Sequence, residues 1–294
     1  MDENYKELSD LAIIVLNYNS SDDTIKCVKQ LLSFSDVFPH IIVVDNCSTD
    51  SSFEHLSNEF HSVNTVDVIL SANNRGYSTG NNYGIRFAKS KYSIKTIGIM
   101  NPDVIIPNSG VLKKLAFELY EENNICIAGA NIKNSNSILD SAWDIPSVKN
   151  LILYHCIIPW IRKNKKELHK RKIKDKVCEV ECIVGCFFFA NLELFESIGL
   201  FDENVFLYNE ENILGIKCKN KNYKEVLVLD HFYYHNHKDN KQKKSFRNKI
   251  NSSKNAYLSR RYLCLNYYSK MWLPLLWLVE SINKAYLMLA YLLK

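Results

Sequence analysis

The first 125 residues alternate short, continuous apolar runs with amphipathic stretches of helical length. Continuous apolar runs are typical of strands buried on both faces of a sheet. A strand followed by a helix, four times over, predicts an α/β fold with a doubly wound, mostly parallel sheet. The predicted strands cover residues 11–16, 41–44, 66–70 and 96–100, and the predicted helices lie near 22–34, 50–60, 79–91 and 109–122.

Amide and carboxylate side chains follow every predicted strand. Because the carboxyl ends of parallel strands share one edge of a sheet, we expect these side chains to converge on one crevice, where such folds bind ligands. Turn formation would explain any single one of them, but four clusters favour a binding edge. The clusters are Asn17 with Asn19, Asp45 with Asn46, Asn73 with Asn74, and Asn101 with Asp103.

Two motifs at this edge suggest a ligand that carries phosphate. Residues 73–85 (NNRGYSTGNNYGI) contain three glycines, which let a backbone approach a diphosphate or a sugar closely. Their spacing, G-x3-G-x3-G, differs from the dinucleotide and P-loop fingerprints and argues against a nicotinamide-dependent dehydrogenase. Asp103 follows a proline at a strand end, and a single carboxylate there suits Mg²⁺ or Mn²⁺ that takes its other ligands from phosphate and water.

Five segments, in order, resemble family 2 of the inverting glycosyltransferases, which have the GT-A fold. The likeness runs from about Leu11 to Tyr257 and is strongest to the rhamnosyltransferase-like enzymes of cell-surface polysaccharide assembly. It implies an enzyme that moves a sugar from a UDP- or dTDP-sugar to a hydroxyl of a glycan or lipid-linked oligosaccharide, with Mn²⁺ or Mg²⁺. The segments are IVLNYNS, VVDNCSTDSS, NNRGYSTGNNYGI, MNPDV and GCFFFANLELFESIGLFDENVFLYNEE.

The resemblance also implies roles for single residues. Glu211 matches the Asp of the family's Glu-Asp motif, the general base that deprotonates the acceptor hydroxyl, and Glu210 would support it. Because neighbouring helix residues diverge by about 100°, we expect only Glu211 to face the acceptor; favourable charge at a helix N-terminus is the alternative explanation for the pair. In the donor site, Asp45 would hydrogen-bond the imide of the pyrimidine base, and Asn17 and Asn19 would line the same pocket. The ribose and the donor sugar would be lined by Asn74, Gly76 and Asn81 or Asn82. The metal would be held by Asp103.

The chain departs from the family pattern near this motif. Ile213 and Lys217 stand where the family has an acid and an arginine, and Glu211 is one methylene longer than the usual aspartate. These departures leave a non-catalytic nucleotide-sugar-binding protein as the alternative function. A second metal ligand is expected on the strand after the catalytic helix, where His235 fits best and a satisfied surface histidine is the alternative.

We expect residues 1–240 to form the catalytic domain, with a nucleotide-binding half near 1–125 and an acceptor half at 126–240. Residues 241–294 would be a helical extension. Its apolar end, residues 271–294, is interrupted by Glu280, Asn283 and Lys284 and predicts a helix or hairpin lying on a membrane, with Trp272, Trp277, Tyr286 and Tyr291 at headgroup level. A dimer-forming helix is the alternative.

Charge and cysteine content suggest a cytoplasmic protein at the inner face of the cell membrane. Residues 162–176 carry nine Lys or Arg against two acids, more than the whole net charge of +5, and would contact anionic lipid or form a solvated loop. Nine scattered cysteines and a polar N-terminus predict reduced thiols and no signal peptide. Nucleic-acid binding is disfavoured because the basic run has no interleaved aromatic residues.

Overall fold

The computed structural model describes residues 8–133, 140–154, 156, 168–235 and 246–292. In the first part of the chain it confirms the predicted alternation of strands and helices. The elements are β1 (Leu11–Asn17), α1 (Ser21–Leu32), β2 (His40–Asp45), α2 (Ser52–Phe60), β3 (Val66–Leu70), α3 (Tyr77–Lys91), β4 (Thr96–Met100), β5 (Val104–Ile105) and α4 (Gly110–Leu119).

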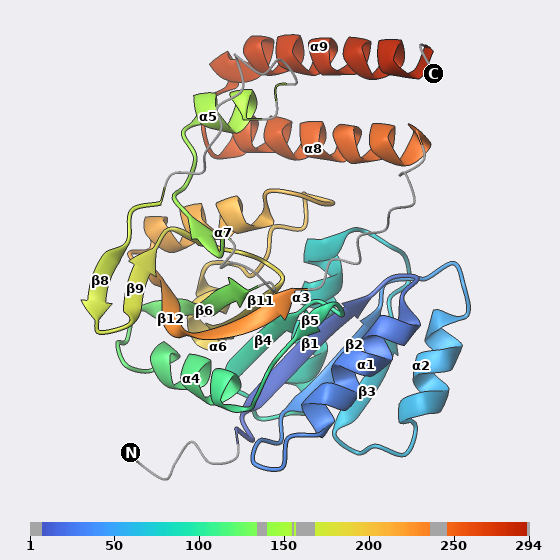
Figure 1. The fold of residues 1–294 in the computed structure, drawn as a ribbon, viewed down its shortest axis with the longest axis vertical. Coiled ribbons are helices and arrows are strands. Elements are labelled where there is room, and N and C mark those ends of the chain that lie inside the picture. Colours follow the sequence, from blue (N-terminus) through green and yellow to red (C-terminus); the bar gives the residue numbers. More distant parts are fainter. Residues whose placement is uncertain (1–7, 134–139, 155, 157–167, 236–245, 293–294) are drawn as a thin grey trace.

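The second part of the chain adds strands to the same sheet and then ends in helices (Figure 1). The elements are β6 (Ile125–Lys133), β7 (Ala142–Trp143), α5 (Val148–Leu153), β8 (Arg171–Lys174), β9 (Val177–Val180), β10 (Cys182–Ile183), β11 (Phe187–Asn191), α6 (Leu192–Ser197), α7 (Glu210–Asn220), β12 (Lys224–His235), α8 (Phe246–Asn266), η2 (Lys270–Trp272) and α9 (Leu273–Leu292).

The main sheet has the order β3-β2-β1-β4-β11-β6-β12-β9-β8, and β5 pairs with the end of β12. The four strands from β3 to β4 are parallel, as are β6 and β12. β11 lies antiparallel between β4 and β6 and joins the two halves into one sheet. The predicted parallel sheet is therefore confirmed for the first four strands, and the sheet as a whole is mixed.

Helices cover both faces of the sheet at β1, β2 and β4, which is why these strands are almost entirely apolar and buried. Leu11, Ile13 and Val15 of β1 point into a core that also contains residues of α1, α2 and α4. Ala12 and Ile14, on the opposite face, pack with residues of α3, α6 and α7. This two-sided burial leaves the ends of the strands as the accessible part of the sheet.

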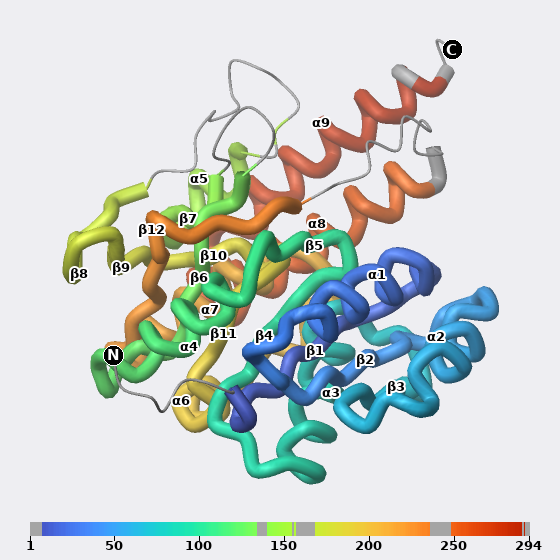
Figure 2. Tube along the Cα trace, turned by 60° about the horizontal axis from the view of Figure 1, so that its bottom comes forward, coloured from blue at the N-terminus to red at the C-terminus, as the bar shows by residue number. Residues whose placement is uncertain are grey.

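The C-terminal helices α8 and α9 run side by side and form a separate layer with α5 (Figures 1 and 2). Leu276 and Val279 of α9 pack with Ile152 and Cys264 in this layer. Trp272, expected at headgroup level, packs half-buried against the same cluster, and its contact with a membrane stays a prediction. Over the described part of the chain, the structure contains no helix that is both long and apolar enough to span a bilayer.

Only part of the basic run falls within the described residues. Arg171–Lys174 form the edge strand β8, which pairs with β9, and the side chains of Arg171 and Lys172 are exposed, so contact with anionic lipid stays a prediction. Residues 162–167 lie outside the described residues. All nine cysteines are free thiols, and eight of them are buried.

Candidate active site

The ends of β1 and β2 are fastened to each other by side chains that were predicted to bind the donor. The parallel register sets Asn17 beside Asp45, and Asn17 Nδ2 donates to Asp45 Oδ2 over 2.7 Å. Both Ser48 N–H and Ser48 Oγ–H also donate to this carboxylate, each over 2.8 Å. Asp45 is fully buried and does not line the cavity that opens at the strand ends. A role for Asp45 in reading the base stays a prediction.

Asn19 joins the same two loops from outside. Its backbone has a φ of 53°, a left-handed conformation that asparagine tolerates well. Its side-chain oxygen accepts from the N–H of Thr49 over 2.8 Å, and its N–H donates to Ser48 Oγ over 2.9 Å. Asn17, Asn19 and Asp45 are thus brought together by the fold, where they hold the loops after β1 and β2 in place.

A cavity of about 520 Å³ opens beside these loops at the carboxyl ends of β1, β2 and β4. Of the predicted donor residues, Asn74, Gly76 and Asp103 line it. Asn74 Oδ1 accepts from Asn46 Nδ2 over 3.1 Å and from the N–H of Gly76 over 3.0 Å, which shapes this wall. Asn46, expected at this edge, lines the cavity too, and Tyr18, Asp23 and Phe206 are lining residues that were not predicted.

Asn81 and Asn82 are buried in α3 and do not line this cavity. Asn82 exchanges two hydrogen bonds with the backbone of Phe201 and donates to Glu203 Oε1 over 2.9 Å. Asn81 donates to the carbonyl of Tyr77 over 3.0 Å. Asn82 therefore attaches α3 to the loop after α6, whereas Asn81 bonds within α3, and the contact of either with ribose or sugar stays a prediction.

Asp103 and His235 meet although 132 residues separate them. The short pairing of β5 with β12 sets His235 opposite Val104, next to Asp103. His235 Nε2 lies 3.1 Å from Asp103 Oδ1. Burial acts to lower the pKa of His235, but the hydrogen bond to Asp103 and the Cys186 thiol outweigh it and raise the pKa to about 10.

This pair has the chemistry of a partial site for a divalent metal. A carboxylate oxygen and an imidazole nitrogen that has released its proton suit Mn²⁺, and Mg²⁺ takes few protein ligands when phosphate supplies the rest. Within residues 8–235, gaps excepted, and 246–292, no group of three or more His, Cys, Asp or Glu could hold a metal by itself. The two side chains therefore fit a cation that depends on a substrate for its remaining ligands.

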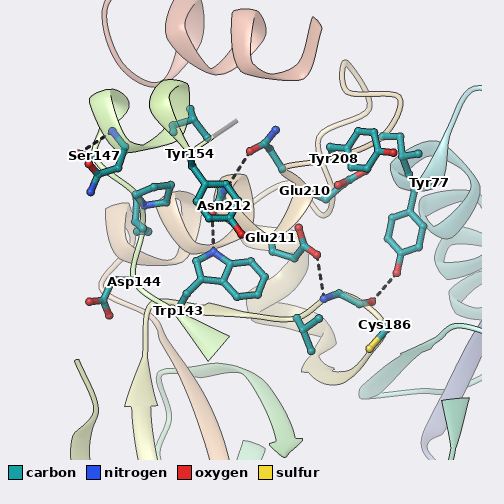
Figure 3. A pocket seen from close by; sticks show the side chains of 18 of the residues that line it. Tyr77, Trp143, Asp144, Ser147, Tyr154, Cys186, Tyr208, Glu210, Glu211 and Asn212 are labelled. Carbon is teal, nitrogen blue, oxygen red and sulfur yellow. Dashed lines mark hydrogen bonds between the residues drawn. The ribbon is translucent and has the colours of Figure 1, made fainter. Parts of the chain in front are cut away.

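A larger cavity of about 830 Å³ lies next to the first and shares Tyr77, Asn101 and Leu207 with it. Figure 3 shows this cavity with the start of α7 in its wall. His235 lines it, so the Asp103–His235 pair lies between the two cavities, with one member in each wall. A ligand bound in the first cavity would meet a second ligand bound in the larger one.

Both Glu210 and Glu211 line the larger cavity, and that Glu211 alone faces the acceptor stays a prediction. They differ in their surroundings. Glu211 Oε1 accepts from the N–H of Gly185 over 3.2 Å. Glu210 is 8% exposed and its Oε1 has no hydrogen-bond partner. Burial and then the charge of Glu211 raise the pKa of Glu210 to about 8, so near neutral pH this acid is mostly protonated.

Aromatic and apolar residues that were not predicted line much of the rest of the larger cavity, beside polar residues such as Asp144 and Asn150. Trp143 Nε1 donates to Asn212 Oδ1 over 2.9 Å, which fixes the indole beside α7. The segment that carries Trp143 is a two-residue strand, too short to give a periodic signal. The other aromatic and aliphatic lining residues are Ile145, Pro146, Leu151, Tyr154, Val184, Leu207 and Tyr208.

The departures from the family pattern have local explanations. Ile213 is buried in a cluster with Leu151, Val205 and Leu263, which connects α7 to α5 and α8. Lys217 donates over 2.8 Å to the carbonyl of Leu200 in the loop after α6. Both positions therefore serve packing and loop attachment here.

Solved structures with similar folds are glycosyltransferases. A mannosyltransferase from Pyrobaculum calidifontis, determined with GDP-Man and Mn²⁺, matches with a TM-score of 0.58 and 13% identity over 97% of this chain and 72% of its own. GalNAc-T7, determined with UDP, GalNAc and Mn²⁺, matches with a TM-score of 0.58 and 15% identity over 80% of this chain and 44% of its own. These likenesses establish the GT-A fold.

Sequence comparison agrees with the fold. The low-salt glycan biosynthesis hexosyltransferase Agl10 of Haloferax volcanii is 26% identical over 215 residues, which are 73% of this chain. The chain spans 63% of that relative's length. The family model described as "Glycosyl transferase family 2" matches residues 12–199, well over half of the chain. The chain therefore belongs to glycosyl transferase family 2.

Proposed function

We propose that this glycosyltransferase is an inverting, metal-dependent hexosyltransferase that uses a UDP- or dTDP-sugar and glycosylates a hydroxyl of a glycan or lipid-linked oligosaccharide. The observation that carries the proposal is the position of Glu211, whose carboxylate lies in a cavity contiguous with the one at the strand ends. The hexosyltransferase of glycan biosynthesis among its relatives supports the choice of substrate class. The rhamnosyltransferase-like subgroup stays a prediction from the sequence.

In the proposed reaction the donor occupies the smaller cavity and the acceptor the larger one. The acceptor oxygen attacks the anomeric carbon from the side opposite the diphosphate, its proton passes to the Glu211 carboxylate, and the bond from carbon to phosphate oxygen breaks. One displacement therefore inverts the anomeric carbon and releases a nucleoside diphosphate. A positioned carboxylate suffices as base because the hydroxyl proton becomes acidic as the new bond forms.

Asp103 and His235 would hold the divalent cation. When bound, the cation neutralises charge that develops on the leaving diphosphate. The structural relatives determined with Mn²⁺ support a divalent metal. The aromatic walls of the larger cavity would stack against the faces of an acceptor sugar.

A thermal-shift screen tests the donor class. UDP, dTDP and GDP and their sugars are added with Mn²⁺ or Mg²⁺, and the melting temperature is compared with that of the protein alone. A pyrimidine nucleoside diphosphate should raise the free energy of unfolding by RT ln(1 + [L]/Kd), and the Tm should rise with it. Stabilisation by GDP alone would overturn the choice of nucleotide, and no stabilisation by any nucleotide would overturn the proposed function.

Substitution of the two glutamates tests the base. Glu211→Gln should lower kcat by roughly a hundredfold or more, because a general base contributes about that much, and should leave nucleotide affinity unchanged. Glu210→Gln should have the smaller effect on kcat, since Glu210 is already mostly neutral. The reverse order would assign the base to Glu210, and a wild-type protein inactive with every donor it binds would favour a non-catalytic binding protein.

A further inference from the structure

The turn between β10 and β11 connects three parts of the site. Its residues are Val184, Gly185 and Cys186. The carbonyl of Cys186 accepts from the N–H of Asn101 over 2.8 Å, just ahead of the metal-binding Asp103. Gly185 has the other two connections, one through its carbonyl and one through its N–H.

The carbonyl of Gly185 accepts a hydrogen bond from the hydroxyl of Tyr77 over 2.7 Å (Figure 3). Burial, followed by the charges of Glu211 and Glu210, raises the pKa of Tyr77 well above its usual value. The phenol therefore stays protonated at neutral pH and remains a donor.

The N–H of the same residue, Gly185, donates to Glu211 Oε1 over 3.2 Å. The two groups touch directly because residue 185 has no side chain. A Cβ at this position would lie 3.0 Å from Glu211 Oε1 and 3.3 Å from its Cγ. Gly185 thus links a tyrosine hydroxyl on one side to the carboxylate of the base on the other.

Tyr77 is itself held at the donor side of the site. It is the first residue of α3, and its N–H donates to the carbonyl of Phe206 over 2.9 Å. Gly76, just before it, has a φ of +98°, and a Cβ there would lie 2.1 Å from the same carbonyl oxygen. The start of α3 is therefore pressed against the loop that leads into α7, and Tyr77 lines both cavities.

We propose that Tyr77 is a positioning residue for the base: its hydroxyl fixes the Gly185 peptide, and that peptide holds the Glu211 carboxylate in place for the acceptor hydroxyl. The inference rests on the proposed role of Glu211. Without the hydroxyl, the turn and the carboxylate gain freedom, so the transfer step slows. Donor affinity should stay, because the backbone contacts of Gly76 and Tyr77 remain.

The test is Tyr77→Phe, which removes one oxygen and keeps the ring. We expect kcat to fall roughly tenfold, as for loss of one hydrogen bond to a catalytic arrangement, while the KM for the donor and the Kd of its nucleoside diphosphate change less than about twofold. The Tm should move by less than about 3 °C. Tyr83→Phe is the matched control, since Tyr83 is an exposed residue of the same helix that lines neither cavity; it should leave every value unchanged.

Unchanged kcat in Tyr77→Phe would overturn the positioning role, as would a parallel loss of kcat, donor affinity and Tm, which indicates general structural damage. Glu211→Gln separates this failure from failure of the proposed function. If Glu211→Gln is inactive and Tyr77→Phe behaves as wild type, only the positioning role is wrong. If Glu211→Gln retains wild-type activity, the base assignment fails and the positioning role with it.

Discussion

At the scale of single residues, Glu210 and Glu211 show how one turn of helix gives two carboxyl groups different properties. Asn209, just before α7, has a φ of 68°, and the helix begins abruptly behind it. Glu211 then meets the N–H of Gly185, while Glu210 is enclosed with one oxygen unpartnered. Burial and the neighbouring charge of Glu211 stabilise the neutral form of this carboxyl group, which is the physical reason for the raised pKa of Glu210.

This difference predicts a pH-dependent stability. In the unfolded chain Glu210 ionises near 4.5, whereas in the folded protein its pKa is about 8. Between these values the folded state keeps a proton that the unfolded state has lost, so stability falls as the pH rises and the penalty is complete above pH 8. Glu210→Gln removes the penalty, so its Tm relative to wild type should rise by roughly 8–16 °C between pH 5 and pH 9, for about 4 kcal/mol.

Differential scanning fluorimetry at the two pH values measures the effect. Glu193→Gln, which removes an exposed carboxylate from α6, controls for the change in net charge. An equal change in Tm between the two pH values for Glu210→Gln and wild type would show that Glu210 is ionised in the folded protein.

Strand-end chemistry could be predicted from the sequence, but the direction of each side chain could not. Asp45 and Asn46 are neighbours at the end of β2, and the sequence marks both as polar. In the structure the Asp45 carboxylate accepts three hydrogen bonds from Asn17 and Ser48, whereas Asn46 lines the cavity. The partner that decides this, Ser48, belongs to a loop whose conformation has no periodic signature.

At the scale of elements, the parallel strands were predictable because each is apolar on both faces and is followed by a helix. The antiparallel β11 and the two-residue β5 were not, since their places depend on pairing with distant strands. The site depends on both. β11 begins directly after the turn that holds Gly185, and β5 sets His235 beside Asp103.

The pairing of β5 with β12 predicts that His235 contributes to metal affinity. His235→Ala should weaken Mn²⁺ binding roughly tenfold or more, because Asp103 loses the neighbouring ligand. Isothermal titration of Mn²⁺, in the presence of the nucleoside diphosphate that stabilises the protein most, measures this. His231→Ala is the control: His231 lies on the same strand, bonds to Asp230 and lines neither cavity. Equal Mn²⁺ affinity in both variants would exclude His235 as a ligand.

At the scale of the whole molecule, the C-terminal helices are coupled to the site through packing. Ile213 follows Glu211 by two residues, and it is buried against Leu151 of α5 and Leu263 of α8. An acid at this position, as the family has, would bury a charge among apolar groups. The departure at Ile213 is therefore explained by the helical layer above α7, and local sequence alone could not reveal it.

The same packing determines which variants can test membrane binding by residues 271–294. Removing residues 271–294 would uncover Ile152 and Cys264 and would take away Glu280. Arg260 and Glu280 are both almost fully buried, with Nη2 and Oε2 3.5 Å apart, so the deletion would leave a buried guanidinium without its carboxylate. Loss of a buried ion-pair partner is strongly destabilising. Substitutions on the exposed face of α9 avoid this damage.

We predict that this exposed face binds the surface of an anionic membrane. Trp277, Lys284, Met288 and Tyr291 recur at helical spacing, and their exposed fractions are large, 65% for Trp277 and 58% for Met288. Aromatic and apolar side chains beside a lysine suit a bilayer interface that carries negative charge. Replacing Trp277, Met288 and Tyr291 by Ser should lower binding to vesicles of phosphatidylglycerol and phosphatidylcholine at least about tenfold, since each large side chain contributes about 1.5–3 kcal/mol when buried.

Cosedimentation with these vesicles measures the binding, and Phe38→Ser, which removes an exposed aromatic ring from the loop after α1, is the control. The buried side chains of α9 are untouched in the triple variant, so its Tm should stay within about 3 °C of wild type. Wild-type protein that does not bind the vesicles, or a triple variant that binds as well as wild type, would contradict the prediction. A triple variant that instead changes from dimer to monomer in light scattering would assign the face to a second copy of the chain.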